Sequence, residues 1–144
     1  FYDNKKKYKK ELQKQVLNSL KKIEKEMGAK FGDKKNPLLL SVRSGARASM
    51  PGMMDTVLNL GLNDTTMKAL INKTGNERFA FDTYRRLITM FGSTVMGIDR
   101  KLFEKPLEKM KGKKGVELDT DLTAQDLKEL VDKFKNIYKR IKLI

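Results

Sequence analysis

The chain contains no cysteine and no histidine among its 144 residues. Without cysteine it forms neither disulfides nor thiolate metal sites, a composition typical of intracellular proteins. Without histidine it offers no imidazole for acid–base catalysis or metal ligation, and no site for a phosphohistidine intermediate. Any chemistry that requires those groups must therefore take place outside this chain.

Long hydrophobic runs are also missing. No apolar stretch approaches the ~20 residues that span a bilayer, and no signal peptide is visible. The length suits one domain with its own core. The chain begins at Phe1 rather than at methionine and ends in an apolar pair at 143–144. We therefore expect a piece of a longer protein, located in the cytoplasm, with an organelle as the alternative.

Positive charge is abundant, since 32 basic residues against 18 acidic ones give a net charge of +14. Such a balance is typical of nucleic-acid-binding proteins. Most lysines, however, fall in expected loops or on the polar faces of expected helices. The aromatic residues follow helical core spacing and form no stacking platform between the lysines. A solvated surface is the favoured interpretation, and a basic helical nucleic-acid-binding module is the alternative.

Hydrophobic periodicity predicts a mostly helical chain with one or two strands that need partners outside it. An amphipathic helix follows Tyr8 to Met27 and stops at Gly28. A short apolar run at 38–42 predicts a buried strand, whereas 53–60 fits a strand or a helix equally. Asn63 or Asp64 can cap a helix that ends near 74–75.

Three more helices are expected after residue 75. The first runs from about 76 to 91 and is ended by Gly92. The second starts near Asp99, and Pro106 interrupts or kinks it because proline lacks an N–H donor. Residues 111–121 predict an exposed loop. Thr123 and Asp126 then resemble a capping box that opens the last helix.

The segment 41–56 reads SVRSGARASMPGMMDT and carries the most information about function. The apolar run at 38–42 leads into small residues with two arginines four apart. Guanidinium groups match pairs of phosphate oxygens, and glycine lets the backbone approach a ligand closely. The chemistry alone supports equally a phosphate-binding loop or a tight connection whose arginines lie in solvent. No Walker motif, which would end in Gly-Lys-Ser or Gly-Lys-Thr, occurs in the chain.

The string from Pro37 to Asp64 closely resembles the ATP-binding domain of the pyruvate, phosphate dikinase family. Segments 74–86 (TGNERFAFDTYRR) and 118–130 (LDTDLTAQDLKEL) resemble the same family. Phosphoenolpyruvate synthases are similar only over a shorter Val-Arg-Ser core. The resemblance implies part of an ATP-grasp-type nucleotide-binding domain, α+β but predominantly helical. We expect residues 1–62 to belong to the ATP-binding subdomain and residues 63–144 to form a helical subdomain.

The resemblance also implies a function. Family members interconvert ATP, phosphate and pyruvate with AMP, pyrophosphate and phosphoenolpyruvate. They use Mg²⁺ and a phosphohistidine in a mobile domain, and they have a separate pyruvate-binding domain. The histidine must lie outside this chain, as must a Gly-Gly-Lys loop and most metal ligands. We expect a homo-oligomeric parent enzyme that is not bound to a membrane, and an isolated chain that is inactive.

Arg43 is the first candidate for catalysis and for phosphate binding. It ends the apolar run, so its stem can be buried while the guanidinium reaches a cleft, and the resemblance implies contact with ATP phosphates. An ion pair with a carboxylate is its structural alternative. Phosphate contacts are also expected from Arg47 and from the backbone amides of Ser44, Gly45 and Ala46.

Other polar and apolar residues near this segment carry weaker expectations. Asp55 could orient an arginine or help to hold Mg²⁺, and a structural role is favoured. The methionines at 50, 53 and 54 should pack the loop rather than contact adenine. Arg78, Arg85 and Arg86 lie at helical spacing from Glu77 and Asp82, which predicts ordinary surface pairs; contact of one of them with nucleotide or with the mobile domain is the alternative.

Overall fold

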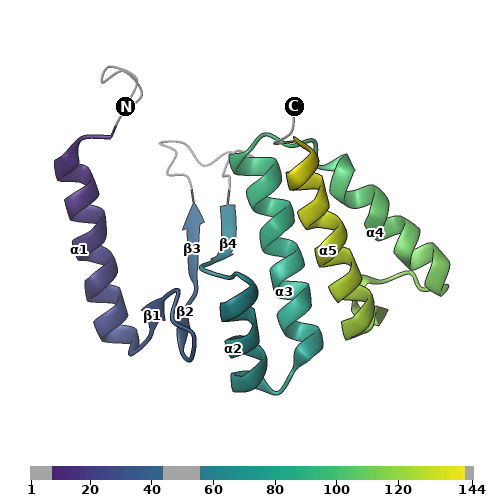
Figure 1. The fold of residues 1–144 in the computed structure, drawn as a ribbon, viewed down its shortest axis with the longest axis horizontal. Helices are drawn as coiled ribbons and strands as arrows, with labels where there is room; N and C mark the ends of the chain where they lie inside the picture. Colours follow the sequence, from purple (N-terminus) through teal and green to yellow (C-terminus); the bar gives the residue numbers. More distant parts are fainter. Residues whose placement is uncertain (1–7, 44–55, 142–144) are drawn as a thin grey trace.

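The computed structural model describes residues 8–43 and 56–141, and within them the chain is predominantly helical, as predicted (Figure 1). Four short strands lie between the first and second of five α-helices, and a π-helical turn and a 3-10 turn lie between later helices. In chain order the elements are α1 (Lys10–Met27), β1 (Lys30–Phe31), β2 (Pro37–Leu38), β3 (Leu40–Arg43), β4 (Thr56–Leu60), α2 (Asp64–Thr74), α3 (Glu77–Met90), the π-helical turn η2 (Phe91–Val95), α4 (Lys101–Lys114), the 3-10 turn η3 (Asp119–Asp121) and α5 (Ala124–Ile141).

The main core lies where α3, α4 and α5 meet. Figure 1 shows α5 alongside α3, with α4 outermost and α1 at the opposite side of the molecule. Phe103 and Phe134 are almost completely buried and meet edge to face, with ring centroids 5.3 Å apart. Val57 of β4 belongs to the same core. Burial of these apolar side chains is the main stabilisation of the helical part.

The first helix confirms the predicted amphipathic pattern, but its apolar face is open. Gly28 caps α1 in the left-handed conformation, and the cap N–H donates to the carbonyl of Glu24. None of the residues of α1 is buried; Val16 is 58% exposed and Met27 65%. The apolar stripe within α1 is therefore largely exposed, with Leu20 half-buried.

The predicted buried strand at 38–42 is wrong in two respects. It is divided between β2, which pairs in parallel with β1, and β3, which pairs antiparallel with β4. Only Leu38 is buried, whereas Val42 is 51% exposed, because a two-stranded sheet leaves much of its surface uncovered. The expectation of partners outside the chain is also wrong for β3, since β4 lies within it. The open choice at 53–60 resolves as strand for Thr56–Leu60, and 53–55 fall outside the described residues.

The expected cap of α2 is confirmed and belongs to Asn63. Its side-chain oxygen accepts hydrogen bonds from the backbone N–H groups of Thr65 at 2.9 Å and Thr66 at 3.0 Å. The Thr66 hydroxyl in turn accepts from the Asn63 N–H at 2.8 Å. This reciprocal pair satisfies N–H groups that a helix start leaves without partners. Gly75 ends the helix in the left-handed conformation.

Gly92 does not end α3, contrary to the prediction. The helix continues into η2, and the chain turns only at Gly97, whose φ is 67°. A Cβ on Gly92 would lie 2.7 Å from Phe103 and 2.8 Å from the Tyr138 hydroxyl. The glycine is therefore needed for close packing against α4 and α5, which the sequence pattern could not distinguish from a helix stop.

Two further predictions about the C-terminal half need correction. The helix α4 continues through Pro106 to Lys114, so the proline does not interrupt it. Residues 111–121 do not form a simple exposed loop, because they contain the last turn of α4 and the turn η3. The Lys111 side chain is only 15% exposed, since it takes part in a network of charges described below.

The predicted capping box at the start of α5 is confirmed. The Thr123 hydroxyl donates to the Asp126 carboxylate at 2.7 Å and accepts from the Asp126 N–H at 3.2 Å. Lys114 of α4 contacts the other carboxylate oxygen at 2.7 Å. The Lys114 ammonium, followed by Thr123, lowers the pKa of Asp126 to about 2. Because the carboxyl of Asp126 is buried, its charged form depends on these partners.

Replacing Lys114 by methionine is expected to raise the pKa of Asp126 toward its ordinary value of 3.8. A depressed pKa stabilises the fold above about pH 4, and this contribution is lost as pH falls toward 2. In Lys114→Met this pH-dependent contribution to stability should be smaller, because the folded and unfolded pKa values of Asp126 lie closer together. Carboxyl carbon NMR titration of Asp126 measures the change. The neighbouring Lys113→Met is the matched control, and an equal shift there would contradict the assignment to Lys114.

Candidate functional site

Arg43 lies at the end of β3, in the antiparallel hairpin that β3 forms with β4. It pairs with Thr56, and Val42 pairs with Val57. The Arg43 side chain is exposed along with those of Ser41 and Val42. Arg43 as a whole residue is exposed, and the expected burial of its stem stays a prediction. The guanidinium is accessible, and neither of the two cavities described below includes it.

The remaining predicted phosphate contacts lie outside the described residues. This applies to Ser44, Gly45, Ala46 and Arg47, and also to Asp55 and the methionines at 50, 53 and 54. Their expected roles stay predictions. Within the described residues, Arg43 alone represents the predicted phosphate site, and it stands on the strand that leads into the arginine loop.

The hairpin that carries Arg43 is irregular. Leu40 pairs with Leu60 and Val42 with Val57, so β4 has two residues where β3 has one. Such an extra residue is a β-bulge. Asn59 lies in it with φ at 59°, and it is the one non-glycine residue with positive φ in the described ranges 8–43 and 56–141. The sequence contains no clear signal for this feature.

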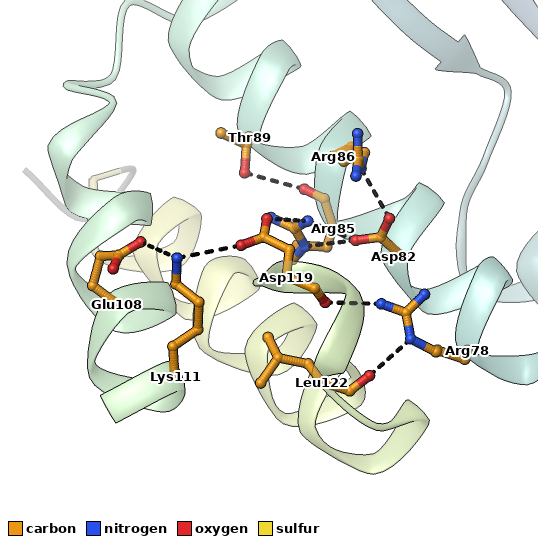
Figure 2. Close-up of polar contacts among 9 residues, drawn as sticks. All are labelled: Arg78, Asp82, Arg85, Arg86, Thr89, Glu108, Lys111, Asp119 and Leu122. Atoms are coloured by element: carbon orange, nitrogen blue, oxygen red, sulfur yellow. Dashed lines mark hydrogen bonds and ion pairs between the residues drawn. The ribbon is translucent and has the colours of Figure 1, made fainter. Parts of the chain in front are cut away.

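A charged network, which sequence reasoning missed, joins α3, α4 and η3 (Figure 2). Arg85 is its centre and is only 5% exposed. Its guanidinium reaches Asp82 at 2.6 Å and Asp119 at 3.0 Å. Asp82 also accepts from Arg86 at 2.9 Å, and Lys111 lies 3.5 Å from Asp119. Each carboxylate thus contacts two cations, which offsets the cost of burying the Arg85 charge.

Arg78 adds a second connection between α3 and η3. Its Nε donates to the carbonyl of Leu122 and its Nη2 to that of Asp119, each at 2.8 Å. The prediction that Arg78, Arg85 and Arg86 make ordinary surface pairs is therefore wrong for Arg78 and Arg85. Only the pair of Arg86 with Asp82 has the predicted helical spacing and an exposed arginine. Arg85 is buried and, besides Asp82, binds Asp119 from 34 residues away, and the partners of Arg78 lie 41 and 44 residues away, beyond the reach of local spacing.

Two cavities flank α3. The first has a volume of about 470 Å³ and lies beside the charged network; its lining includes Arg85, Arg86, Arg100, Glu104 and Asp119. The second, of about 380 Å³, is mostly apolar and contains Tyr84, Tyr138 and Lys135. Burial raises the pKa of Tyr138 to about 12, and its hydroxyl donates to the carbonyl of Ile88 at 2.6 Å. Both phenols therefore stay protonated, since burial raises the pKa of Tyr84 as well.

No resident metal site is apparent in 8–43 or 56–141, where no three metal-ligating side chains gather closely enough to hold an ion. The carboxylates of Figure 2 are each engaged by arginine or lysine. In the same part of the chain, every helix is too short or too polar to cross a bilayer.

Comparison with known proteins identifies the domain. The family model described as the pyruvate phosphate dikinase AMP/ATP-binding domain matches residues 5–89. The chain belongs to the pyruvate, phosphate dikinase family. Residues 5–89 include the arginine segment, the hairpin strands β3 and β4, and most of α3, so the match covers Arg43 and the arginines of α3.

Curated dikinases are similar over nearly the whole chain. The chain is 55% identical over 139 residues to the pyruvate, phosphate dikinase of Clostridium symbiosum. It is 60% identical over 128 residues to the chloroplastic enzyme of Mesembryanthemum crystallinum, and 60% over 124 residues to pyruvate, phosphate dikinase 2 of Zea mays. These matches cover 96%, 89% and 86% of this chain, but only 16%, 13% and 14% of the relatives. None of these dikinases supports the alternative of a nucleic-acid-binding module.

Proposed function

We propose that this chain is part of the nucleotide-binding domain of an enzyme that interconverts ATP, phosphate and pyruvate with AMP, pyrophosphate and phosphoenolpyruvate. The observation that carries the proposal is the 55–60% identity to proteins named pyruvate, phosphate dikinase over nearly the whole chain. An unrelated activity is a poor fit for similarity of that extent. Because the chain spans about one sixth of those relatives or less, the complete reaction requires other parts of the parent polypeptide.

Within that domain we assign the ATP phosphates to the arginine segment. Arg43 would stabilise the charge that develops on the transferred phosphoryl group, which is how preorganised cations accelerate phosphoryl transfer. Arg47 and the backbone amides of Ser44, Gly45 and Ala46 would complete the contacts. The exposure of Arg43 at the end of β3 supports this role, because its guanidinium is free to meet a ligand.

The domain would be ATP-grasp-type, with residues 1–62 in the ATP-binding subdomain and residues 63–144 in a helical subdomain. The core contact of Val57 with the helices argues that the two parts pack closely rather than as separate units. Among the described residues no three metal-ligating side chains gather together, and we expect any Mg²⁺ that serves the reaction to be held mostly by other parts of the parent polypeptide.

The partners follow from what this chain lacks. It has no histidine, so the phosphohistidine would come from another domain of the parent polypeptide, and pyruvate would bind to a further domain. A homo-oligomeric parent in the cytoplasm remains our prediction, with an organelle as the alternative. The isolated chain would bind MgATP weakly or not at all, and would not turn over.

The full-length parent polypeptide tests the proposal directly. It should form phosphoenolpyruvate from ATP and pyruvate only when inorganic phosphate is present, and should release pyrophosphate with AMP. A coupled spectrophotometric assay with and without phosphate measures the formation of phosphoenolpyruvate and the release of pyrophosphate. Turnover that does not depend on phosphate would instead place the enzyme with the phosphoenolpyruvate synthases. A folded parent without either activity would refute the proposal.

A further inference from the structure

The register of the hairpin changes immediately before Arg43. From the pair of Leu40 with Leu60, a regular antiparallel ladder would go on to place Val42 opposite Leu58 and Arg43 opposite Val57. The structure instead pairs Val42 with Val57 and Arg43 with Thr56. One additional residue in β4 produces this shift by one position.

The shift decides on which face of the hairpin Arg43 lies. Directly opposite residues in an antiparallel pair share a face, and neighbouring residues along a strand project to opposite faces. Val57 is 6% exposed and belongs to the core. Without the additional residue, Arg43 would project from the face of Val57; Val42 lies opposite Val57 instead and is 51% exposed, so the register sets the direction of Arg43 rather than its burial. With the bulge, Arg43 lies opposite Thr56 and is exposed.

Asn59 is the residue whose backbone accommodates the bulge. Its φ of 59° is in the left-handed region, which most side chains disfavour and which glycine, asparagine and aspartate tolerate best. One residue of a bulge commonly adopts this conformation. Strained or left-handed residues of this kind are often found next to functional sites, where they orient a side chain.

We propose that Asn59 is a positioning residue for Arg43: its left-handed backbone holds the bulge that sets the register of β3 against β4, and so directs the guanidinium toward the phosphates. This inference rests on the proposed function of Arg43. The conformation of Asn59 is the property required, not the hydrogen-bonding capacity of its amide. The competing explanation for the left-handed conformation of Asn59 is a local role in the turn to α2. In that turn the Leu62 N–H donates to the Asn59 carbonyl at 3.2 Å.

The test replaces Asn59 in the full-length parent enzyme and measures phosphate-dependent phosphoenolpyruvate formation. Asn59→Ala, which disfavours positive φ, is expected to lower kcat by about 10- to 100-fold, because a misplacement of about 1 Å at a catalytic group can cost as much. Asn59→Gly, which adopts positive φ freely, should retain activity close to wild type. Asn72→Ala, on an exposed position of α2, is the matched control and should change nothing.

A double-mutant cycle separates positioning from general stability. If Asn59 acts through Arg43, the variant Arg43→Ala/Asn59→Ala should be no less active than Arg43→Ala alone. Three results would each overturn the inference. In the first, the double variant is less active than Arg43→Ala by the same factor as Asn59→Ala is less active than wild type. In the others, Asn59→Ala and Asn59→Gly lose activity equally, or Asn59→Ala keeps full activity. Should Asn59→Ala fail to fold, loss of activity in folded Asn59→Gly would still overturn it. Full activity in Arg43→Ala would refute the role of Arg43 itself, and the inference with it.

Discussion

Arg43→Ala in the full-length parent enzyme is expected to lower kcat by about 100- to 1000-fold, the usual effect of removing one preorganised donor that stabilises transition-state charge. The folded protein should be nearly as stable as wild type, because Arg43 is exposed on β3 and substitutions of exposed residues usually change stability by less than ~0.5 kcal/mol. Steady-state kinetics with ATP, phosphate and pyruvate, together with thermal unfolding, measure the two effects.

Two further variants make the result specific. Arg43→Lys keeps the charge but loses the planar fork that binds two phosphate oxygens, so it should recover only part of the activity. Arg140→Ala removes an exposed arginine from the far end of α5 and should leave kcat unchanged. Full activity in Arg43→Ala would reduce Arg43 to a structural residue while leaving the family assignment intact.

The second large effect is expected at Arg85, and it concerns stability. Arg85→Met should lower the free energy of unfolding by about 3 kcal/mol, since removing one partner of a buried ion pair typically costs 3–5 kcal/mol. We expect the lower end of that range because both carboxylates retain a cationic partner in the variant. Asp82 still pairs with Arg86 at 2.9 Å, and Asp119 still pairs with Lys111 at 3.5 Å. The loss should also loosen η3, which Arg85 joins to α3. Urea unfolding of the 144-residue chain measures the difference.

Arg86→Met is the matched control, because it is the adjacent residue and shares the partner Asp82. Its side chain is 55% exposed, and exposed ion pairs contribute about 0–1 kcal/mol. The two methionine variants should therefore differ by about 2 kcal/mol or more in unfolding free energy, given those typical values. Equal stability of the two would show that the Arg85 network contributes no more than a surface pair.

The comparison of Arg85 with Arg86 shows where prediction from sequence stops. Both arginines lie three or four residues from Asp82, so local spacing treats them alike. Arg85 becomes a buried residue in a place where η3 brings Asp119 to it from 34 residues further along the chain. Packing between distant segments has no signature in a three- or four-residue pattern.

The roles of individual glycine and proline residues are also only partly predictable from the sequence. Gly28 and Gly75 end helices as predicted, since each adopts a left-handed conformation that is locally favourable. Gly92 follows a helical stripe in the same way, yet it is required by Phe103 and Tyr138. Pro106 should break a helix by propensity alone, and α4 nevertheless continues through it. At Gly92 the tertiary contacts outweigh the local preference.

At the candidate site, too, some features can be predicted from the sequence and others depend on the tertiary structure. A string as specific as the segment from Pro37 to Asp64 identifies the family without any structure, and the family model confirms it. Helix caps at Asn63 and Thr123 are equally readable, because a short side chain bonds the backbone only two or three residues away. The face of the hairpin from which Arg43 projects, in contrast, depends on the register of β3 against β4.

The sequence by itself determined the family, the helical character of the chain, most helix boundaries and the absence of histidine or cysteine chemistry. Those properties depend on residue identity and on interactions between near neighbours. Only the tertiary structure decided the bulge at Asn59, the buried position of Arg85 and the open face of α1. Each of these depends on which distant segments meet, and that follows from the packing of the whole domain rather than from any local pattern.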